Sequence, residues 1–216
     1  MIELVIFDMD GVLVDSEPAI TYASMEALSE IGVKAEYEDF KPFTGMGDDK
    51  FIAGVAEKYG REYDVKLKER AYQIYIEKTD RVKVFKSSKR LIEALIAQGL
   101  KCAVASASDL IKVKANLSRI GVDVSVFAGI ITGSDVKNKK PDPEIFLKAA
   151  DFCKIPAEKS IVVEDAVSGV RAAKSAGMNC IAVTTSFDKP TLEAAGADYV
   201  IDELYEVFAI VENLRS

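Results

Sequence analysis

The sequence predicts an α/β fold, a doubly wound parallel (Rossmann-like) sheet with an inserted helical cap domain. Three observations lead to this prediction. The chain opens on a short apolar run at residues 4–7 (LVIF), which is typical of a strand buried on both faces. From about Ser87 onward, helical and strand-like patterns alternate. The stretch between these two parts has a helical pattern and shows no clear strand.

Each element of the alternating part has its own local signal. Helices are expected where apolar residues recur at helical spacing and a glycine follows, and strands where a short apolar run comes next. The predicted helices begin near Ser87, Asp109, Pro143 and Val167, and the predicted strands cover residues 101–105, 128–131, 160–163, 179–183 and 199–201. This strand–helix–strand order favours parallel strands.

The helical stretch at residues 16–84 leaves the first strand and returns to the second, so we expect it to be an insertion into the α/β domain. The predicted domains are an α/β core at residues 1–15 and 85–216 and a helical cap at residues 16–84. The two junctions, residues 15–17 and 84–87, are expected to act as a hinge that closes the cap over the carboxyl edge of the sheet.

Composition narrows the possible chemistry. The 216 residues carry a net charge of −7, three widely spaced cysteines and no histidine. The lack of histidine excludes Ser-His-Asp and Cys-His catalysis and His-ligated zinc. The acidic charge argues against nucleic acid or an anionic membrane as a partner. Without a disulfide or metal pattern or a membrane-spanning stretch, we expect a cytoplasmic protein, with a monomer as the default.

Two carboxylates, Asp8 and Asp10, follow the first apolar run directly. Ligands of open α/β sheets bind at the carboxyl ends of the strands, where carboxylates can hold a hard cation or attack a phosphoryl group. The simpler interpretation is that Asp10-Gly11 only marks a turn.

Other polar groups follow later strands. Ser106 comes after the strand at residues 101–105, and Glu164-Asp165 comes after the strand at residues 160–163. Lys140 precedes Pro141 in a loop. Each has a simpler role as well: Ser106 or Asp165 could cap a helix, and Lys140 could be a solvated surface residue. Together they supply the nucleophile, acid/base, metal ligands and charge stabiliser that phosphoryl transfer needs.

These motifs resemble those of the haloacid dehalogenase (HAD) superfamily. The resemblance rests on Asp8-Met9-Asp10-Gly11-Val12, Ser106, Lys140-Pro141 and Glu164-Asp165, in the same order and spacing along nearly the whole chain. The helical insertion resembles the C1 cap. The segments around Ser106, Lys140 and Glu164 resemble the β-phosphoglucomutase-like branch in particular.

The resemblance implies a role for each of these residues. Asp8 would attack phosphorus and become an aspartyl-phosphate, and Asp10 would protonate the leaving oxygen and then deprotonate water. The cofactor would be Mg²⁺, held by Asp8, by the backbone carbonyl of Asp10 and by Asp165, with Glu164 in a direct or supporting role. Ser106, Ala107 and Lys140 would bind the substrate's phosphoryl group.

The cap departs from the β-phosphoglucomutase pattern. Ile20 stands where that branch usually has a histidine, and Lys86-Ser87 stands where Pro-Gly is common. The loop expected to meet the substrate contains Thr44, Gly45, Met46, Gly47 and Lys50, with Lys50 as its only cation. Arg70 is a further candidate from a later cap helix.

The leading prediction is therefore a Mg²⁺-dependent phosphatase that hydrolyses a small phosphorylated metabolite, a sugar phosphate being the first choice. The alternative in the same branch is a hexose-phosphate mutase. A dehalogenase is disfavoured because that reaction needs neither Asp10 nor a metal. A phospho-accepting receiver module would have its acceptor on a mid-chain strand and no cap. A binding domain without catalytic activity is the remaining alternative.

Overall fold

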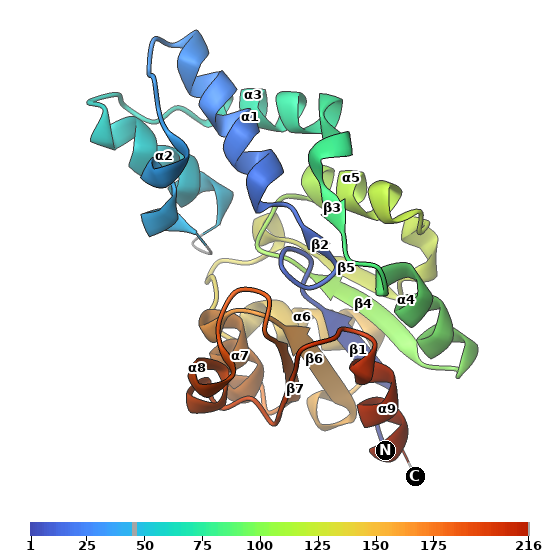
Figure 1. Ribbon diagram of the computed structural model, residues 1–216. Helices are drawn as coiled ribbons and strands as arrows, with labels where there is room; N and C mark the ends of the chain where they lie inside the picture. Colours follow the sequence, from blue (N-terminus) through green and yellow to red (C-terminus); the bar gives the residue numbers. More distant parts are fainter. Residues whose placement is uncertain (45–46, 216) are drawn as a thin grey trace.

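The structure is a computed structural model that describes residues 1–44 and 47–215. Its centre is a six-stranded sheet in the order β5-β4-β1-β6-β7-β8, in which all neighbouring strands are parallel (Figure 1). The strands are β1 (Leu4–Phe7), β4 (Lys101–Ala105), β5 (Gly129–Ile131), β6 (Ser160–Glu164), β7 (Asn179–Val183) and β8 (Tyr199–Ile201). The predicted doubly wound α/β class is confirmed.

Helices cover both faces of the sheet because successive residues of a strand point to opposite sides. The core helices are α4 (Ser88–Ala97), α5 (Leu110–Ile120), α6 (Glu144–Cys153), α7 (Val167–Ser175), α8 (Lys189–Ala195) and α9 (Glu206–Asn213). Leu4 and Ile6 of β1 pack with α6, α7 and α8, whereas Val5 and Phe7 pack with α4, α5 and α9. All four side chains are fully buried, and burying each one stabilises the fold by about 1.5–3 kcal/mol.

The inserted stretch forms a helical lobe, hereafter the cap, above the carboxyl edge of the sheet (Figure 1). Its helices are α1 (Glu17–Glu30), α2 (Asp48–Lys58) and α3 (Val65–Glu77), and short 3₁₀ turns cover Tyr37–Asp39, Lys41–Phe43 and Thr79–Arg81. The core has three further 3₁₀ turns, at Val124–Val126, Gly133–Asp135 and Ala157–Lys159. The boundaries between the two predicted domains stay a prediction.

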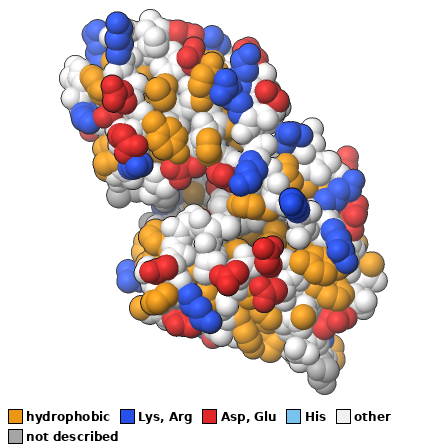
Figure 2. Space-filling view, in the orientation of Figure 1, with side chains coloured by type: hydrophobic (Ala, Val, Ile, Leu, Met, Phe, Trp, Pro, Cys, Tyr) orange, Lys and Arg blue, Asp and Glu red, His pale blue; other side chains and the backbone are white. Residues whose placement is uncertain are grey.

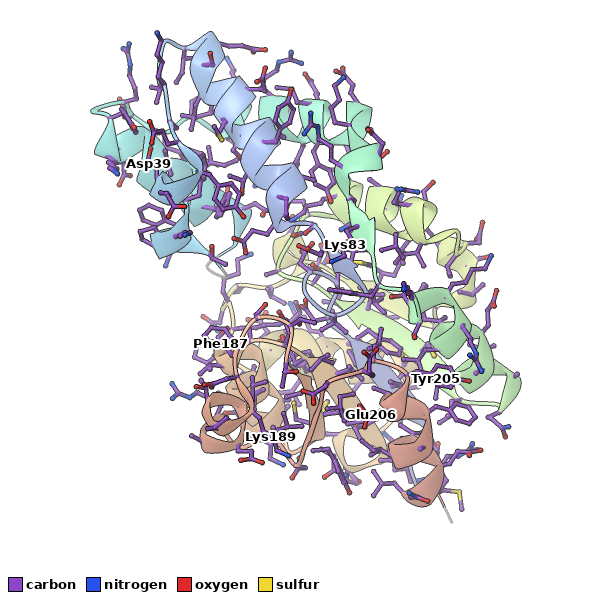
Figure 3. All side chains as sticks on the ribbon, in the orientation of Figure 1. Asp39, Lys83, Phe187, Lys189, Tyr205 and Glu206 are labelled. Atoms are coloured by element: carbon purple, nitrogen blue, oxygen red, sulfur yellow. The ribbon has the colours of Figure 1, made fainter. Side chains whose placement is uncertain are left out.

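The expectation that residues 16–84 contain no strand is wrong at their end. Lys83–Val84 form β3, which pairs antiparallel with β2 (Val14–Asp15). The two crossings between cap and core run side by side here, and a strand of two residues is too short to show a period of its own. Lys83 lies at the junction of the two lobes in Figure 3.

The cap and the core meet through packed side chains. Figure 2 shows them as two lobes that meet across a notch on one side of the molecule. Phe51, Val55 and Tyr75 of the cap belong to the same buried apolar cluster as Val104 and Val113 of the core. The cap is therefore docked on the core in this structure.

The described ends of the chain lie at the amino edge of the sheet. The Glu3 N–H donates to the carbonyl of Lys159, next to the start of β6, and the Glu3 carbonyl accepts the N–H of Lys101, at the start of β4. The Arg215 guanidinium donates to the carbonyl of Gln98, just before β4. Both ends therefore lie opposite the carboxyl edge. Among the helices that the structure describes, none is long and apolar enough to cross a membrane.

Candidate active site

Asp8 lies at the centre of the carboxyl edge of the sheet. It follows β1, where the strand order reverses, with β4 and β5 on one side and β6 to β8 on the other. Phe7 pairs with Val104 and Val163, so Asp8 comes to lie beside Glu164. Such a reversal point is where ligands of doubly wound sheets bind.

Lys140 connects the groups on these strands. Its ammonium lies 2.5 Å from Asp8 Oδ1 and 2.6 Å from Glu164 Oε1. It also donates to the carbonyl of Ala105 at 3.4 Å and lies 4.9 Å from the centre of the Phe146 ring. The side chain is only 9% exposed, so the interpretation of a solvated surface lysine is wrong. Burial lowers its pKa, but the two carboxylates outweigh burial and raise the pKa of Lys140, which keeps it charged.

Three buried carboxylates surround this cation. Asp8, Glu164 and Asp165 are all buried, and within the part of the chain that the structure describes Lys140 is the cation that pairs with Asp8 and Glu164. Burial raises the pKa of Asp8 to about 7, against the opposing effect of Lys140. Burial, followed by the charges of Glu164 and Asp8, also raises the pKa of Asp165. Three buried carboxyl groups thus share one cation, and full ionisation of all three would leave an excess of negative charge.

Two glycines make room for these carboxylates. A Cβ atom on Gly11 would lie 1.9 Å from Asp165 Oδ2, and Gly11 has a φ of +83°. A Cβ on Gly169 would lie 1.7 Å from Glu164 Oε1. Gly11 thus lets Asp165 reach the loop after Asp8, and Gly169 lets α7 pass directly over Glu164.

The chemistry of this donor set fits a divalent cation. Among residues 1–44 and 47–215, no three His, Cys, Asp or Glu side chains are grouped so that they could hold a metal by themselves. A metal would therefore need ligands such as the Asp8 and Asp165 carboxylates together with a backbone carbonyl such as that of Asp10. Carboxylate and carbonyl oxygens are what Mg²⁺ prefers, and its charge would balance the excess.

Both carboxylate oxygens of Glu164 already accept hydrogen bonds from protein groups. Besides the Lys140 ammonium on Oε1, its Oε2 accepts hydrogen bonds from the backbone N–H groups of Asp165 and Ala166, both at 2.8 Å. These contacts favour the supporting role among the two that the sequence left open. The N-cap of α7 is Ala166, so the helix-cap interpretation of Asp165 is wrong.

Asp10 is held by donors from three segments. Ser16 and Ser108 donate their hydroxyls to its two carboxylate oxygens, the second at 2.8 Å. The Lys112 ammonium and the Asn116 amide each lie 3.4 Å from Asp10 Oδ1. Burial acts against these groups, but together they lower the pKa of Asp10, with the charge of Lys112 first. Its side chain is 30% exposed, so a substrate can still approach it.

Ser106 and Ala107 lie where β4 leaves the sheet. Ser106 is fully buried, its N–H donates to the Ile131 carbonyl at 3.0 Å, and its hydroxyl accepts from the N–H of Ser108 at 3.2 Å. Ala107 is half-buried. The N-cap of α5 is Asp109, so the helix-cap interpretation of Ser106 is wrong. Their phosphate-binding role stays a prediction.

The cap loop is described only in part. Gly45 and Met46, both predicted to meet the substrate, lie outside the described residues. Thr44 is exposed and its hydroxyl donates to Glu17 of α1 at 3.4 Å. Gly47 precedes α2 with a φ of +87° and open space beside its Cα, and Lys50 is exposed on α2.

The prediction that Arg70 approaches the site is wrong. Its guanidinium pairs with Glu30 of α1 at 2.8 Å and also donates to Gln73. Both partners lie within the cap, and Arg70 is 40% exposed. Residues two apart on a helix face different directions, and Lys68 of α3 is the one that pairs with the core, through Asp109 at 2.9 Å.

Several supporting residues were not predicted from the sequence. Thr185 donates to the carbonyl of Gly11 at 2.5 Å, and Ser186 donates to Asp165. Both follow β7, whose strand pattern was the available signal that polar side chains would reach the same edge. Lys112 and Asn116 lie within a helix that looked like ordinary core, so nothing in the pattern marked them.

Comparison with known proteins finds a matching family and several similar proteins. The sequence pattern of the haloacid dehalogenase-like hydrolases matches residues 5–183. The chain is 39% identical over 209 residues to the Arabidopsis thaliana protein SUPPRESSOR OF QUENCHING 1, chloroplastic, covering 94% of this chain and 20% of that protein. It thus spans only a fifth of the length of this relative.

Other relatives match over nearly their whole length. The chain is 32% identical to the phosphorylated carbohydrates phosphatase of Thermotoga maritima, covering 90% of this chain and 92% of that protein. Among solved structures, a mutant of CbbY from Rhodobacter sphaeroides in complex with xylulose-(1,5)bisphosphate is similar, with a TM-score of 0.83 and 26% identity over 95% of this chain and 96% of that chain.

Proposed function

Because the chain belongs to the family of haloacid dehalogenase-like hydrolases, we propose that it is a Mg²⁺-dependent phosphatase of a small phosphorylated metabolite. One observation carries the proposal. The Lys140 ammonium bridges Asp8 and Glu164 beside Asp165, at the point where the strand order reverses. A buried nucleophile, a fixed cation and carboxylates that can hold a metal are what phosphoryl transfer requires.

The reaction would proceed in two displacements. Lys140 contacts Oδ1 of Asp8, so Oδ2 would attack phosphorus. The bond from phosphorus to the substrate oxygen breaks, and that oxygen takes a proton from Asp10. Asp10 would have taken this proton from solvent beforehand, because its surroundings outweigh burial and lower its pKa. Water then attacks the aspartyl-phosphate and gives its proton to Asp10, and phosphate leaves as Asp8 is regenerated.

The chain's own residues would hold the phosphoryl group throughout. Lys140 and the Ser106 hydroxyl would balance charge on the phosphoryl oxygens, while Glu164 keeps Lys140 in place. Asp8, Asp165 and the Asp10 carbonyl would hold Mg²⁺, which would supply further positive charge to the phosphoryl oxygens.

A sugar phosphate is the substrate class that we propose first. One relative is named as a phosphatase of phosphorylated carbohydrates, and CbbY has been solved with a sugar bisphosphate. The cap would select the sugar, because in such folds specificity lies in the parts added to the core.

A hexose-phosphate mutase remains the alternative. A mutase must grip a second phosphate, which calls for free cations on the cap. Among the described cap residues, Lys68 pairs with Asp49 and Asp109, and Arg70 pairs with Glu30. Of the loop residues expected to meet the substrate, Lys50 is the one cation, and it is exposed on α2. One cation is a weak grip for a second phosphate, so hydrolysis of a monophosphate is the better fit.

The proposal is tested by a panel of sugar monophosphates and bisphosphates with Mg²⁺, assayed for phosphate release by wild-type protein and by Asp8→Asn. We expect turnover by the wild type, none in excess EDTA, and a loss of about a thousandfold or more in the variant, since other nucleophilic enzymes lose at least this much. Asp123→Asn, an exposed aspartate after α5, is the matched control and should keep full activity.

Two outcomes would contradict the proposal. Substantial turnover by pure Asp8→Asn would exclude Asp8 as the nucleophile. Rapid formation of glucose 6-phosphate from β-glucose 1-phosphate with a trace of the 1,6-bisphosphate, faster than phosphate release, would favour the mutase.

A further inference from the structure

Two helices, one from the cap and one from the core, meet through a row of polar pairs. Lys68, Tyr72 and Tyr75 share one face of α3, because residues three or four apart on a helix are neighbours. Lys112 and Asn116 share one face of α5 in the same way, and Asp109 is the N-cap residue of that helix. We call these six residues the cap–core ladder. The two helices lie next to each other in Figure 1, and the pairs join them along their length.

At the outer end of the ladder, ion pairs and hydrogen bonds join the cap to the core. The Lys68 ammonium lies 2.8 Å from Asp49 of the cap and 2.9 Å from Asp109 of the core. The Tyr72 hydroxyl accepts the N–H of Asp109 at 3.4 Å and donates to Asp48 at 2.6 Å. None of these contacts involves Asp10.

The inner end of the ladder reaches Asp10. The Lys112 side chain is 3% exposed, and its ammonium lies 3.4 Å from both Asp10 Oδ1 and Asp48 Oδ1. The fully buried Asn116 donates to Asp10 Oδ1 at 3.4 Å and accepts from the Tyr75 hydroxyl at 2.5 Å. Each of these core residues therefore touches Asp10 with one contact and the cap with another.

We propose that Lys112 is a positioning residue, which fixes Asp10 for proton transfer when the cap is docked and Asp48 completes its surroundings. Asn116 acts in the same way through Tyr75. The geometry explains why a lysine is buried here between two carboxylates of different domains: it aligns the acid/base with the cap. The inference rests on the proposed phosphatase function, in which Asp10 transfers the proton.

The test uses the leaving group, because only a poor leaving group needs the proton of Asp10. Wild type and Lys112→Met are compared on a sugar phosphate and on 4-nitrophenyl phosphate, whose leaving group departs without a proton. We expect kcat on the sugar phosphate to fall about 10- to 100-fold, part of what general acid–base catalysis supplies, with KM nearly unchanged. On the aryl phosphate the loss should stay within about threefold.

Lys68→Met is the matched control. It removes a half-buried cation from the same interface, but one that pairs with Asp49 and Asp109 and has no contact with Asp10 in this structure. If it weakens only the docking of the cap, its losses on the two substrates should be equal. Asp48→Asn keeps the shape of its side chain and is the second variant if Lys112→Met does not fold. It should show the same selective loss at a smaller magnitude.

The outcomes separate this inference from the function on which it rests. Wild-type protein that hydrolyses neither substrate overturns both. Active wild type combined with equal losses, no loss or a gain on the sugar phosphate in Lys112→Met and Asp48→Asn overturns the positioning role alone. A selective loss in Lys68→Met as large as that in Lys112→Met also overturns it, because contact with Asp10 would then not be the cause.

Discussion

At the scale of single residues, the site depends on how closely carboxylates approach the backbone. Helix α7 passes over Glu164 at Gly169, where even one methyl group would collide with the carboxylate. A glycine inside a helix ordinarily destabilises it by about 0.5–1 kcal/mol relative to alanine. At Gly169 we expect the opposite, because an alanine methyl group would displace the Glu164 carboxylate. That carboxylate in turn holds Lys140 against Asp8.

We therefore expect Gly169→Ala to lower both stability and activity. The added methyl must displace Glu164 or α7, and such overpacking costs about 1–3 kcal/mol. Displacing Lys140 by about 1 Å should lower kcat by up to about a hundredfold. Urea unfolding and phosphate release measure the two effects. Arg171→Ala, at an exposed position of the same helix, should change neither much, and a more stable and fully active Gly169→Ala would contradict this account.

The same scale shows why some site residues could be predicted and others could not. Asp8, Lys140 and Asp165 stand directly after a strand or before a proline, so the pattern of the chain marks their places. Lys112 lies within the amphipathic helix α5 and meets Asp10 and the cap residue Asp48 only in the folded chain. Asp48, which contacts Lys112, is 64 positions away in the sequence, so this pair could not be predicted from spacing.

At the scale of elements, the loop before α6 presents Lys140, and Glu144 in the first turn of that helix holds the loop. The Glu144 carboxylate accepts the N–H groups of Lys137 and Asn138 and pairs with Lys148 at 2.8 Å. The hydrogen bond from Lys148 and those from the backbone lower the pKa of Glu144 to about 2. The charged carboxylate thus stabilises the folded loop.

This pKa gives the sign of a pH effect. A carboxyl group whose pKa is lower in the folded chain stabilises the fold above its unfolded pKa, and this stabilisation is lost as the pH falls through about 2. We expect Glu144→Gln to be less stable than wild type near pH 6, with the difference shrinking below about pH 4.5. Urea unfolding across this pH range measures it.

The control for Glu144 is Glu193→Gln on α8, whose exposed carboxylate lies 3.9 Å from Lys189. It should change stability little at any pH, because exposed pairs contribute little. A stability difference between Glu144→Gln and wild type that does not depend on pH would show that the charge of Glu144 is not what holds the loop.

The short elements were the hardest to predict from the sequence. The strands β4 and β7 have five residues each and the predicted bounds, and β6 runs one residue past its predicted end at Val163, to Glu164. Helices α8 and α9 have only seven and eight residues, too few for a clear helical period, and they were not predicted. The ribbon β2–β3 is held by pairing between chain segments far apart in sequence, which no local pattern reveals.

At the scale of the whole molecule, we expect the crowded carboxylates at the carboxyl edge to link folding to Mg²⁺. The buried carboxylates repel one another, and burial and the neighbouring charges raise the pKa of Asp165. Because a folded-state pKa above the unfolded value destabilises the charged carboxyl at neutral pH, Asp165→Asn should raise the melting temperature in EDTA.

With Mg²⁺ present, wild type should have the higher melting temperature and Asp165→Asn the lower one. A ligand that binds only the folded state stabilises it by about 2.7 kcal/mol at a hundred times its Kd, so Mg²⁺ should raise the melting temperature of wild type and that of Asp165→Asn much less. Thermal unfolding with Mg²⁺ or EDTA measures this, with Asp123→Asn as the control that keeps the wild-type shift. An equal Mg²⁺ shift in Asp165→Asn would exclude Asp165 as a ligand.

Other expectations for the whole molecule stay predictions. These are the cytoplasmic location, the monomeric state and the lack of affinity for nucleic acid or membranes. On the face drawn in Figure 2, Lys and Arg side chains are interspersed with Asp and Glu rather than gathered into one basic surface. This mixture is in line with the net charge of −7.

The position of the chain ends bears on how this fold can be joined to other proteins. Glu3 and Arg215 are both held at the amino edge of the sheet, across the core from Asp8 and the cap. A neighbouring domain fused at either end would therefore lie away from the site and from the cap. Such a tether could bring the enzyme to a membrane, a filament or a second catalyst without altering which molecules enter it.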